Sequence, residues 1–418
     1  MKILLYSTNY YPEMTGIAKY NTELAEWLVA NGHKVDVYTA MPSYPEWEVY
    51  EEYKGKKYIK EIINGVNVYR SHLYVPNKKN ISGIKRILMQ VTFSFNSLRF
   101  WIPTFLRKKE HDLVIALCPP LMPLINAVIY KKIKKTPILL HVQDLEFDAA
   151  IRLGIIKQKF LSQILNNVEK FFLNRVNVIS SITNSMIDRI KEKKIKTTNF
   201  ILFPNWSNIS FITPLPKINK FRDSFTKNND DIIIMYSGNM GNKQGLEIVI
   251  DVAKKFKSKD INHVKFIFVG DGVSKEGLIE MKNLDNLDNV LFFPIQPLEL
   301  LPELLASADI HLVIQKKEAA DLVMPSKLTN ILSAGRTAIA TAEPGTALYD
   351  VINSSDSGVV IEPENPDILH DTLLDLIARD NLYNFEQNAR KYAEEYLDKE
   401  MILKRFEKNI RKFLNKGE

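Results

Sequence analysis

The chain has 418 residues, of which 45% are hydrophobic and 25% charged, and its formal net charge is +7. This composition describes an ordinary soluble protein that is long for a single core and suits two domains. The single cysteine, Cys118, excludes a disulfide framework and a zinc cluster built on cysteines. The opening "MKILLYSTNYY" predicts a short buried strand rather than a signal peptide, so we expect a cytoplasmic protein.

Short apolar runs alternate with helical patterns along the chain, which is typical of parallel sheets covered by helices. In the first half, strands are expected at 2–7, 34–40, 112–117, 137–142, 176–182 and 200–205. A polar, proline-bearing linker is expected at 206–230, followed by strands at 231–238, 264–270, 289–294, 309–315, 337–342 and 358–362. The pattern predicts two doubly wound α/β domains that face a central cleft, with ligands beyond the carboxyl ends of the strands.

Residues 76–109 hold eight Lys or Arg and no acidic residue, with aromatic residues between them. Polar residues interrupt the segment too often for it to span a bilayer, which needs about 20 predominantly apolar residues. It could instead lie on an anionic membrane surface, and the alternative is a core helix with a solvated basic end. The expected lipid-facing residues are Phe93, Phe95, Phe100 and Trp101, flanked by Lys78, Lys79, Lys85, Arg86, Arg107, Lys108 and Lys109. No motif for nucleic-acid binding is recognisable.

Two loops that follow predicted strands carry glycines ahead of a helix. Gly16 lies at the mouth of a helix, where it lets the backbone approach a ligand or serves only the turn. In "SGNMGNKQGLEIVI", Gly238, Gly241 and Gly245 are spaced around Lys243. Close backbone approach, a helix N-terminus and a lysine suit a diphosphate, although the spacing matches neither common phosphate-loop motif. A purely structural loop is the alternative.

The segment "MPSKLTNILSAG" at 324–335 reads as a helix start, with proline, serine and Lys327 ahead of an apolar run. Asn330 interrupts the apolar face one turn later. No Asp-x-Asp pair occurs in the chain, so a metal-bridged diphosphate is not expected. Lys243, Lys327 and two helix starts would then neutralise the anion, without a metal or another cofactor.

These motifs together resemble family 4 of the glycosyltransferases, in the retaining GT-B class, over the whole chain. The matching segments are "YYPEMTGIAKYNTELAEWLVANGHKVDVYTA" for the opening loop and helix, "FPNW" for the entry to the second domain, "SGNMGNKQGLE" for the diphosphate loop, and "VGDG" and "LPELLASADIHLVI" beside the nucleotide pocket. Three further segments, "LHVQDLEFDAAIRLG", "MPSKLTN" and "AEPGTAL", resemble the branch that builds colanic acid and O-antigen. That branch includes fucosyl- and N-acetylfucosaminyltransferases.

The resemblance implies two Rossmann-like domains. Residues 1–205 would bind the acceptor and residues 206–399 the nucleotide-sugar, with a C-terminal helix at about 400–418 crossing back to the first domain. Closure of the domains around the donor is the expected motion.

The resemblance also assigns roles to residues of the donor side. Gly16 would place a backbone N–H near the diphosphate, and Lys243 would neutralise it, with Asn239 standing where many relatives carry arginine. Ile295 and Gln296 fall where relatives bind the base through backbone groups. The remaining residues expected beside the donor phosphates are Gly238, Gly241, Glu343, Pro344, Gly345 and Thr346. Lys327 is added to them because of its place at a helix start and not because of the resemblance.

The sequence departs from the family at a pair of glutamates that relatives separate by seven residues. The second glutamate, which holds the ribose hydroxyls in relatives, is replaced by Asn330, and Leu322 stands eight residues earlier. Asparagine can still donate to and accept from a hydroxyl, or it packs against its own helical turn. Asp321 or Glu318 could replace the contact of the first glutamate with the sugar.

Relatives often place a histidine after a strand of the first domain to contact the donor sugar. Gln143 takes that position in "HVQD", while His141 is on the same face of the strand and is either a second candidate or a core residue. Asp144, and Glu146 or Asp148 beyond it, could orient the acceptor hydroxyl. In the retaining mechanism that the resemblance implies, the leaving phosphate takes the acceptor proton, so catalysis rests on positioning and charge stabilisation.

The resemblance and the basic segment together predict a sugar transfer at the inner face of the cytoplasmic membrane. The expected donor is UDP-N-acetyl-L-fucosamine ahead of GDP-fucose, and the expected acceptor is a sugar linked to undecaprenyl diphosphate. Two alternatives stay open. One is a non-hydrolysing sugar-nucleotide epimerase on the same architecture, and the other is a non-catalytic membrane-associated scaffold that kept the fold.

Overall fold

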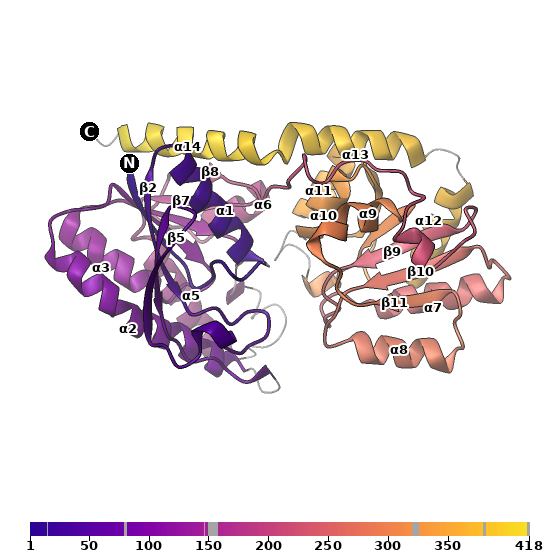
Figure 1. Ribbon diagram of the computed structural model, residues 1–418, viewed down its shortest axis with the longest axis horizontal. Helices are drawn as coiled ribbons and strands as arrows, with labels where there is room; N and C mark the ends of the chain where they lie inside the picture. Colours follow the sequence, from indigo (N-terminus) through magenta and orange to yellow (C-terminus); the bar gives the residue numbers. More distant parts are fainter. Residues whose placement is uncertain are drawn as a thin grey trace. The chain divides into compact units, whose positions relative to one another are not determined.

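The computed structural model describes residues 1–14, 16–78, 82–145, 147–148, 158–319, 326–378 and 382–415. It divides the chain into two compact units (Figure 1). The first unit is Met1–Phe203 together with Phe406–Glu418, and the second is Pro204–Arg405. Each unit is built around its own sheet.

In the first unit, the described residues form an 8-stranded sheet in the order β3-β4-β2-β1-β5-β6-β7-β8. Its strands are β1 (Lys2–Tyr6), β2 (Lys34–Ala40), β3 (Tyr58–Ile63), β4 (Val66–Ser71), β5 (Leu113–Cys118), β6 (Ile138–Val142), β7 (Val178–Ser181) and β8 (Phe200–Leu202). Its helices include α1 (Ile17–Ala30), α2 (Gly83–Leu106), α3 (Leu124–Lys134), α5 (Lys159–Leu173) and α6 (Asn184–Glu192). Figure 1 shows α2 and α3 on one face of this sheet and α1 on the other.

The pair β3–β4 corrects the sequence analysis, which placed no strand between residues 40 and 112. Asn64 and Gly65 join the two strands with positive φ angles of 48° and 81°, as a two-residue hairpin turn requires. The pairing is antiparallel, with Ile63 opposite Val66. At the end of β4, the buried guanidinium of Arg70 donates to the backbone carbonyl of Tyr11 and so fixes the loop after β1.

In the second unit, the described residues form a 6-stranded parallel sheet in the order β11-β10-β9-β12-β13-β14. All six strands lie where the sequence predicts them: β9 (Ile232–Ser237), β10 (Val264–Val269), β11 (Val290–Phe293), β12 (Ile310–Val313), β13 (Thr337–Thr341) and β14 (Gly358–Ile361). One apolar core lies under α7 (Glu247–Ser258), α8 (Lys275–Leu284) and α12 (Pro366–Ala378). The other lies under α9 (Leu301–Ala306), α10 (Ser326–Ser333), α11 (Ala347–Ser355) and α13 (Leu382–Tyr396).

Residues 206–230 are a packed part of the second unit, and the prediction of a linker is wrong. Ile212 and Phe221 are buried in its core. The buried guanidinium of Arg222 donates to the backbone oxygen of Ser307 at 2.9 Å and to the carboxylate of Asp309 at 3.2 Å. The polar residues of segment 206–230 therefore include ones that hold the segment in the unit through buried hydrogen bonds and ion pairs.

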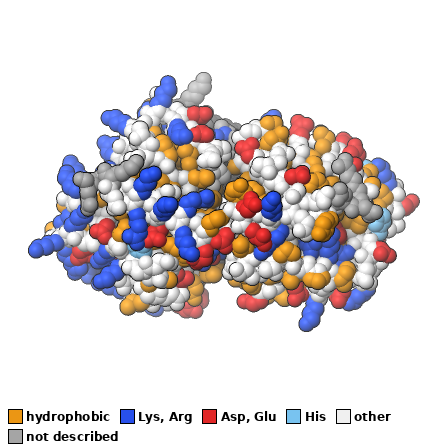
Figure 2. All heavy atoms as spheres, turned by 90° about the horizontal axis from the view of Figure 1, so that it is seen from above, with side chains coloured by type: hydrophobic (Ala, Val, Ile, Leu, Met, Phe, Trp, Pro, Cys, Tyr) orange, Lys and Arg blue, Asp and Glu red, His pale blue; other side chains and the backbone are white. Residues whose placement is uncertain are grey.

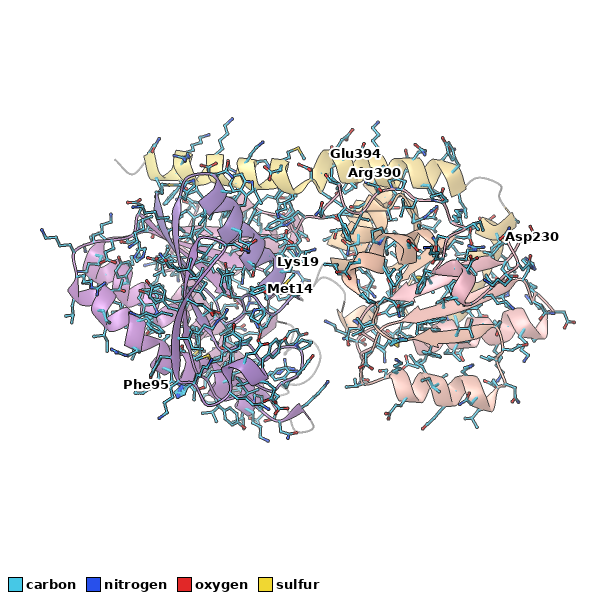
Figure 3. The ribbon with its side chains drawn as sticks, in the orientation of Figure 1. Met14, Lys19, Phe95, Asp230, Arg390 and Glu394 are labelled. Atoms are coloured by element: carbon cyan, nitrogen blue, oxygen red, sulfur yellow. The ribbon has the colours of Figure 1, made fainter. Side chains whose placement is uncertain are left out.

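The C-terminal helices return the chain to the first unit. On α13, Arg390 donates to the backbone oxygens of Ile212 and Ser333, and it forms an ion pair with Glu394 at 2.7 Å (Figure 3). Helix α14 (Lys399–Asn415) brings Phe406 onto Phe203, with ring centroids 3.6 Å apart and planes 8° apart. Figure 2 looks onto this side and shows basic and acidic side chains next to one another.

We expect Arg222→Met to lower the free energy of unfolding of the second unit by about 3 kcal/mol, because the change leaves the buried backbone oxygens of Ser307 and Asp231 without this donor and removes one cation from Asp309. Urea unfolding measures the loss. Lys227→Met, an exposed change in the same segment, is the control and should stay within about 0.5 kcal/mol of the parent. Equal stabilities of the two variants would mean that the segment is the linker the sequence suggested.

Candidate functional site

The loop after β9 packs against the loop after β10 at the carboxyl edge of the second sheet. Met240 donates its N–H to the oxygen of Asp271 at 2.8 Å, and Ser274 donates to the oxygen of Met240 at 2.9 Å. A Cβ on Gly270 would lie 2.0 Å from the oxygen of Gly238. The motifs "SGNMG" and "VGDG" therefore need glycine because two backbones touch, and their contact sets the shape of the loop.

The ammonium of Lys327 lies at this loop. It comes from the first turn of α10, and its Nζ is 3.5 Å from the centroid of the Tyr236 ring. A Cβ on Gly238 would lie 3.2 Å from that Nζ, so glycine leaves the space the ammonium occupies. Among the described residues, the buried Nζ has no hydrogen-bond partner.

Burial, with the nearby charge of Lys243, lowers the pKa of Lys327 from 10.5 to about 7. A shift of this size corresponds to about 5 kcal/mol against the charged form. A desolvated cation over a tyrosine ring recovers about 2 kcal/mol, which does not offset that cost. A buried lysine with a strongly lowered pKa, lying against the loop after β9, makes this loop a candidate site for an anion.

Two further lysines come close to the same loop. Lys243 is exposed within it, and its backbone oxygen accepts from the N–H of Lys316 at 2.9 Å. The aliphatic chain of Lys316, which follows β12, lies on Gly245, where a Cβ would be 2.8 Å from its Cγ. The loop after β9, the loop after β12 and α10 thus each contribute a lysine. No group of three or more His, Cys, Asp or Glu suited to a metal occurs in the described part of the chain.

Asn330 lies one turn after Lys327 and is partly exposed. Its amide oxygen accepts from the hydroxyl of Ser207 at 3.2 Å. This partner lies outside the helix, so the side chain is not simply packed against its own turn. The hydrogen bond orients the amide and leaves its N–H donors for another contact. Asp321 and Leu322, at the position of the first family glutamate, lie outside the described residues.

The loop of residues 343–346 is held by its own contacts. Glu343 forms an ion pair with Lys317 at 2.6 Å. The hydroxyl of Thr346 donates to the oxygen of Glu343 at 2.8 Å and caps α11. Gly345 has a φ of 84°, which glycine adopts readily. Glu318 is exposed in the short helix η5 (Lys317–Ala319).

Ile295 and Gln296 follow β11, two strands away from β9 in the sheet. Ile295 is 72% exposed, and the side chain of Gln296 donates to the oxygen of Pro294 at 2.9 Å. An exposed isoleucine at a strand end offers its backbone groups and an apolar surface, which suits contact with a base better than with a phosphate.

Gly16 begins α1 in the first unit with a φ of 58° and a ψ of −135°. A Cβ at this position would meet nothing within 4 Å, so the backbone conformation and not space requires glycine. The same loop carries Glu13, which the sequence analysis did not single out. Its buried carboxylate accepts from the N–H groups of Ser43 at 2.7 Å and Tyr44 at 2.8 Å, which ties the loops after β1 and β2 together.

His141 has a structural role. It is 2% exposed, its Nε2 accepts from the amide of Gln143 at 2.9 Å, and its Nδ1 donates to the hydroxyl of Ser180 at 2.9 Å. Burial lowers the pKa of His141 to about 3, so the ring is neutral. Gln143 is 5% exposed and is itself engaged by this contact.

The acidic residues after β6 have different environments. Burial and the charges of Glu13 and Asp144 raise the pKa of Tyr44, which places the partly exposed Asp144 near Tyr44. Asp148 forms an ion pair with Lys193 at 2.6 Å, which has a structural role in this unit. Glu146 lies outside the described residues.

The structure corrects the expected membrane-facing residues of the basic segment. Phe93, Phe100 and Trp101 are buried in α2, and the ring centroid of Trp101 lies 5.2 Å from that of Tyr6. Only Phe95 of the four aromatics is exposed, at 72% (Figure 3). A different stripe of α2 faces outward: Ile84, Ile87, Leu88, Val91, Phe95, Ile102 and Leu106. No helix in the described ranges is both long and apolar enough to cross a membrane.

Comparisons with known proteins agree with this architecture. The family "Glycosyl transferase 4-like domain" matches residues 15–206, and "Glycosyl transferases group 1" matches residues 217–396. A curated relative, the "Putative colanic acid biosynthesis glycosyl transferase WcaI" of Escherichia coli K12, is 38% identical over 417 residues. The alignment covers 98% of this chain and 100% of the relative.

Solved structures share the fold at low sequence identity. A sucrose-phosphate synthase from Thermosynechococcus elongatus aligns with a TM-score of 0.76 at 15% identity, covering 99% of both chains. Anabaena Alr3699/HepE, solved in complex with UDP, aligns with a TM-score of 0.73 at 15% identity, covering 99% of this chain and 100% of that one. With both units matched and a relative 38% identical along its whole length, the chain belongs to the group 1, family 4-like glycosyltransferases and has their GT-B fold.

Proposed function

We propose that this glycosyltransferase moves an L-fucose-type sugar, N-acetyl-L-fucosamine, from UDP to a lipid-linked sugar acceptor during assembly of a surface polysaccharide. The single observation that carries the donor side is the buried ammonium of Lys327, which lies against the glycine loop without a protein acceptor among the described residues. The relative WcaI, by its name, acts in colanic acid biosynthesis, and the HepE structure contains UDP. The first supports a role in surface polysaccharide assembly, and the second supports a donor linked to UDP.

The proposed reaction retains the configuration of the sugar. The bond between the anomeric carbon and the diphosphate oxygen breaks, and the acceptor hydroxyl forms a new bond to that carbon from the same face. The departing phosphate oxygen takes the hydroxyl proton, so no protein base is required. Lys243 and Lys327 stabilise the negative charge that grows on the diphosphate, and the backbone of Gly238 and Gly241 allows its close approach.

Asn330 takes the ribose in this proposal. Its amide oxygen is engaged by Ser207, so it would donate its N–H groups to the ribose hydroxyl oxygens, where a glutamate would accept. Ile295 and Gln296 would contact the base, and the loop of Glu343, Gly345 and Thr346 would lie beside the phosphates. No step of the reaction needs a metal ion.

The acceptor side rests on α2. Its outward stripe is apolar, and exposed Arg107, Lys108 and Lys109 follow the helix end. Apolar side chains beside cations suit the boundary between the acyl chains and headgroups of an anionic leaflet. We infer that the enzyme works at the cytoplasmic face of the membrane, where an acceptor linked to undecaprenyl diphosphate is presented.

Lys327→Met tests whether the lysine is kept for binding. The folded pKa of Lys327 is about 7 and the unfolded value 10.5, so the cost of burying the charge is fully present below about pH 7 and fades as the pH rises toward 10.5. The ligand-free variant should therefore melt at least about 2 °C higher than the parent near pH 6, with a smaller difference near pH 9. Lys220→Met, an exposed change in the same unit, should have no effect. A lower melting temperature for Lys327→Met near pH 6 would make the lysine structural.

A panel of nucleotide-sugars tests the donor and the reaction. We expect UDP-N-acetyl-L-fucosamine to raise the melting temperature more than GDP-L-fucose or UDP-glucose. With the lipid-linked acceptor, NMR of the product should show the anomeric configuration of the donor. Conversion of the donor without any acceptor would identify an epimerase, and the absence of stabilisation by every nucleotide would identify a scaffold.

Lys243→Ala should reduce kcat/KM at least about 100-fold with an unchanged fold, because it removes a charge that stabilises the leaving group. Steady-state kinetics measure the loss, and circular dichroism checks the fold. Lys220→Ala is the matched control. Activity equal to that of the control would remove the assigned diphosphate role of Lys243.

Vesicle flotation tests the role of α2. The variant Ile84→Gln, Leu88→Gln, Phe95→Gln should bind vesicles of phosphatidylcholine and phosphatidylglycerol at least about tenfold less, since each exposed side chain loses apolar contact. Val273→Gln, Leu284→Gln removes apolar side chains of similar exposure from the second unit and should bind like the parent. Equal binding of both variants would contradict a membrane contact through α2.

A further inference from the structure

Tyr236 contacts both parts of the proposed diphosphate site, although neither the motifs nor the family resemblance singled it out. It lies near the carboxyl end of β9 and is 1% exposed. Its ring faces the ammonium of Lys327 at 3.5 Å. Its hydroxyl donates to the backbone oxygen of Asn239 at 2.6 Å, within the glycine loop. One buried side chain thus joins the α10 lysine to the loop after β9.

We propose that Tyr236 is a positioning residue for the donor diphosphate: its ring holds the Lys327 ammonium at the glycine loop. The inference rests on the proposed donor site. It concerns a nucleoside diphosphate, because two lysines and a loop of close-packed backbone suit two linked phosphates.

An aromatic ring is suited to this task for an electrostatic reason. A carboxylate partner would neutralise Lys327 and compete with the incoming phosphate. The face of a ring attracts the cation through its quadrupole and carries no net charge, so the cation stays available to an anion. The positive charge of Lys243 repels that of Lys327, so the Lys327 ammonium needs an attractive contact to stay at the loop.

The arrangement also brings a second cation to the loop that carries Asn239 and Lys243. Here the second cation comes from α10, on another segment, and reaches the loop through the long chain of Lys327. A long side chain loses conformational entropy when it is held in one place. The Tyr236 ring restricts the Lys327 side chain before the donor binds, so less entropy is lost on binding. The Lys327 ammonium lies between two parts of this segment: the ring of Tyr236 on β9 and the backbone of Gly238 in the following loop.

The test compares Tyr236→Phe, which keeps the ring, with Tyr236→Leu, which removes it. Dissociation constants of UDP and of GDP are measured by calorimetry for the full chain. We expect Tyr236→Phe to bind within about threefold of the parent and Tyr236→Leu at least about tenfold more weakly. In the Lys327→Met background, Tyr236→Leu should cause no more than about a twofold further loss, since both changes remove the same interaction.

Phe268→Leu is the control for a purely structural effect. Its ring is buried on β10, and its centroid lies 6.2 Å from that of Tyr236. The variant should lose stability and keep the affinity of the parent for the nucleoside diphosphate. Lower affinity in Phe268→Leu by the same factor as in Tyr236→Leu would overturn the inference, as would equal losses for Tyr236→Leu with and without Lys327.

The outcomes separate this inference from the function on which it rests. If Lys327→Met binds UDP and GDP as the parent does, or the parent binds neither, the proposed donor site is wrong and the role of Tyr236 falls with it. If Lys327→Met weakens binding and Tyr236→Leu does not, the donor site stands and the inference about Tyr236 is wrong.

Discussion

The proposed donor site depends on the burial of one positive charge that no carboxylate of the described residues offsets. Lys327 is kept against Tyr236 and Gly238 at a cost that the ring recovers only in part. A buried charge that lowers the stability of the fold is expected where ligand binding compensates for that loss. At other positions an apolar side chain would replace the lysine. The rest of the loop follows from this constraint. Glycine at 238 leaves space for the ammonium, and glycines at 270 and 272 let the neighbouring loop support the same backbone.

The strands of the second unit could be predicted from the sequence because each is a short apolar run bounded by polar or glycine residues. The hairpin β3–β4 was missed although its signal was present. Asn64 and Gly65 are the residues a two-residue turn favours, but polar and charged residues interrupt the apolar runs of both flanking strands, and β3 lies at the sheet edge. A search for long apolar runs does not find an edge hairpin.

The residues of the candidate site also differ in how clearly the sequence indicates them. Glycine loops and lysines near predicted helix starts have a local signal, so the sequence predicts Gly238, Lys243 and Lys327 as candidates for the proposed donor site. Tyr236 has none, because a tyrosine in a strand reads as core and its partner is 91 residues away on another element. The prediction that Phe93, Phe100 and Trp101 of α2 face lipid was wrong for a different reason. Spacing identifies the faces of a helix and does not say which face the sheet covers, so Phe93 and Trp101 were placed outside.

In the proposed reaction, which uses no metal, three lysines would supply the positive charge. A divalent cation brings two charges at one point, whereas Lys243, Lys316 and Lys327 come from three separate segments and approach one loop. Lysine chains are flexible, so their charges need local anchors: a ring for Lys327 and a backbone contact over Gly245 for Lys316. In the proposed donor site, cations that are in place before the nucleoside diphosphate binds can stabilise the negative charge that grows on it in the transition state.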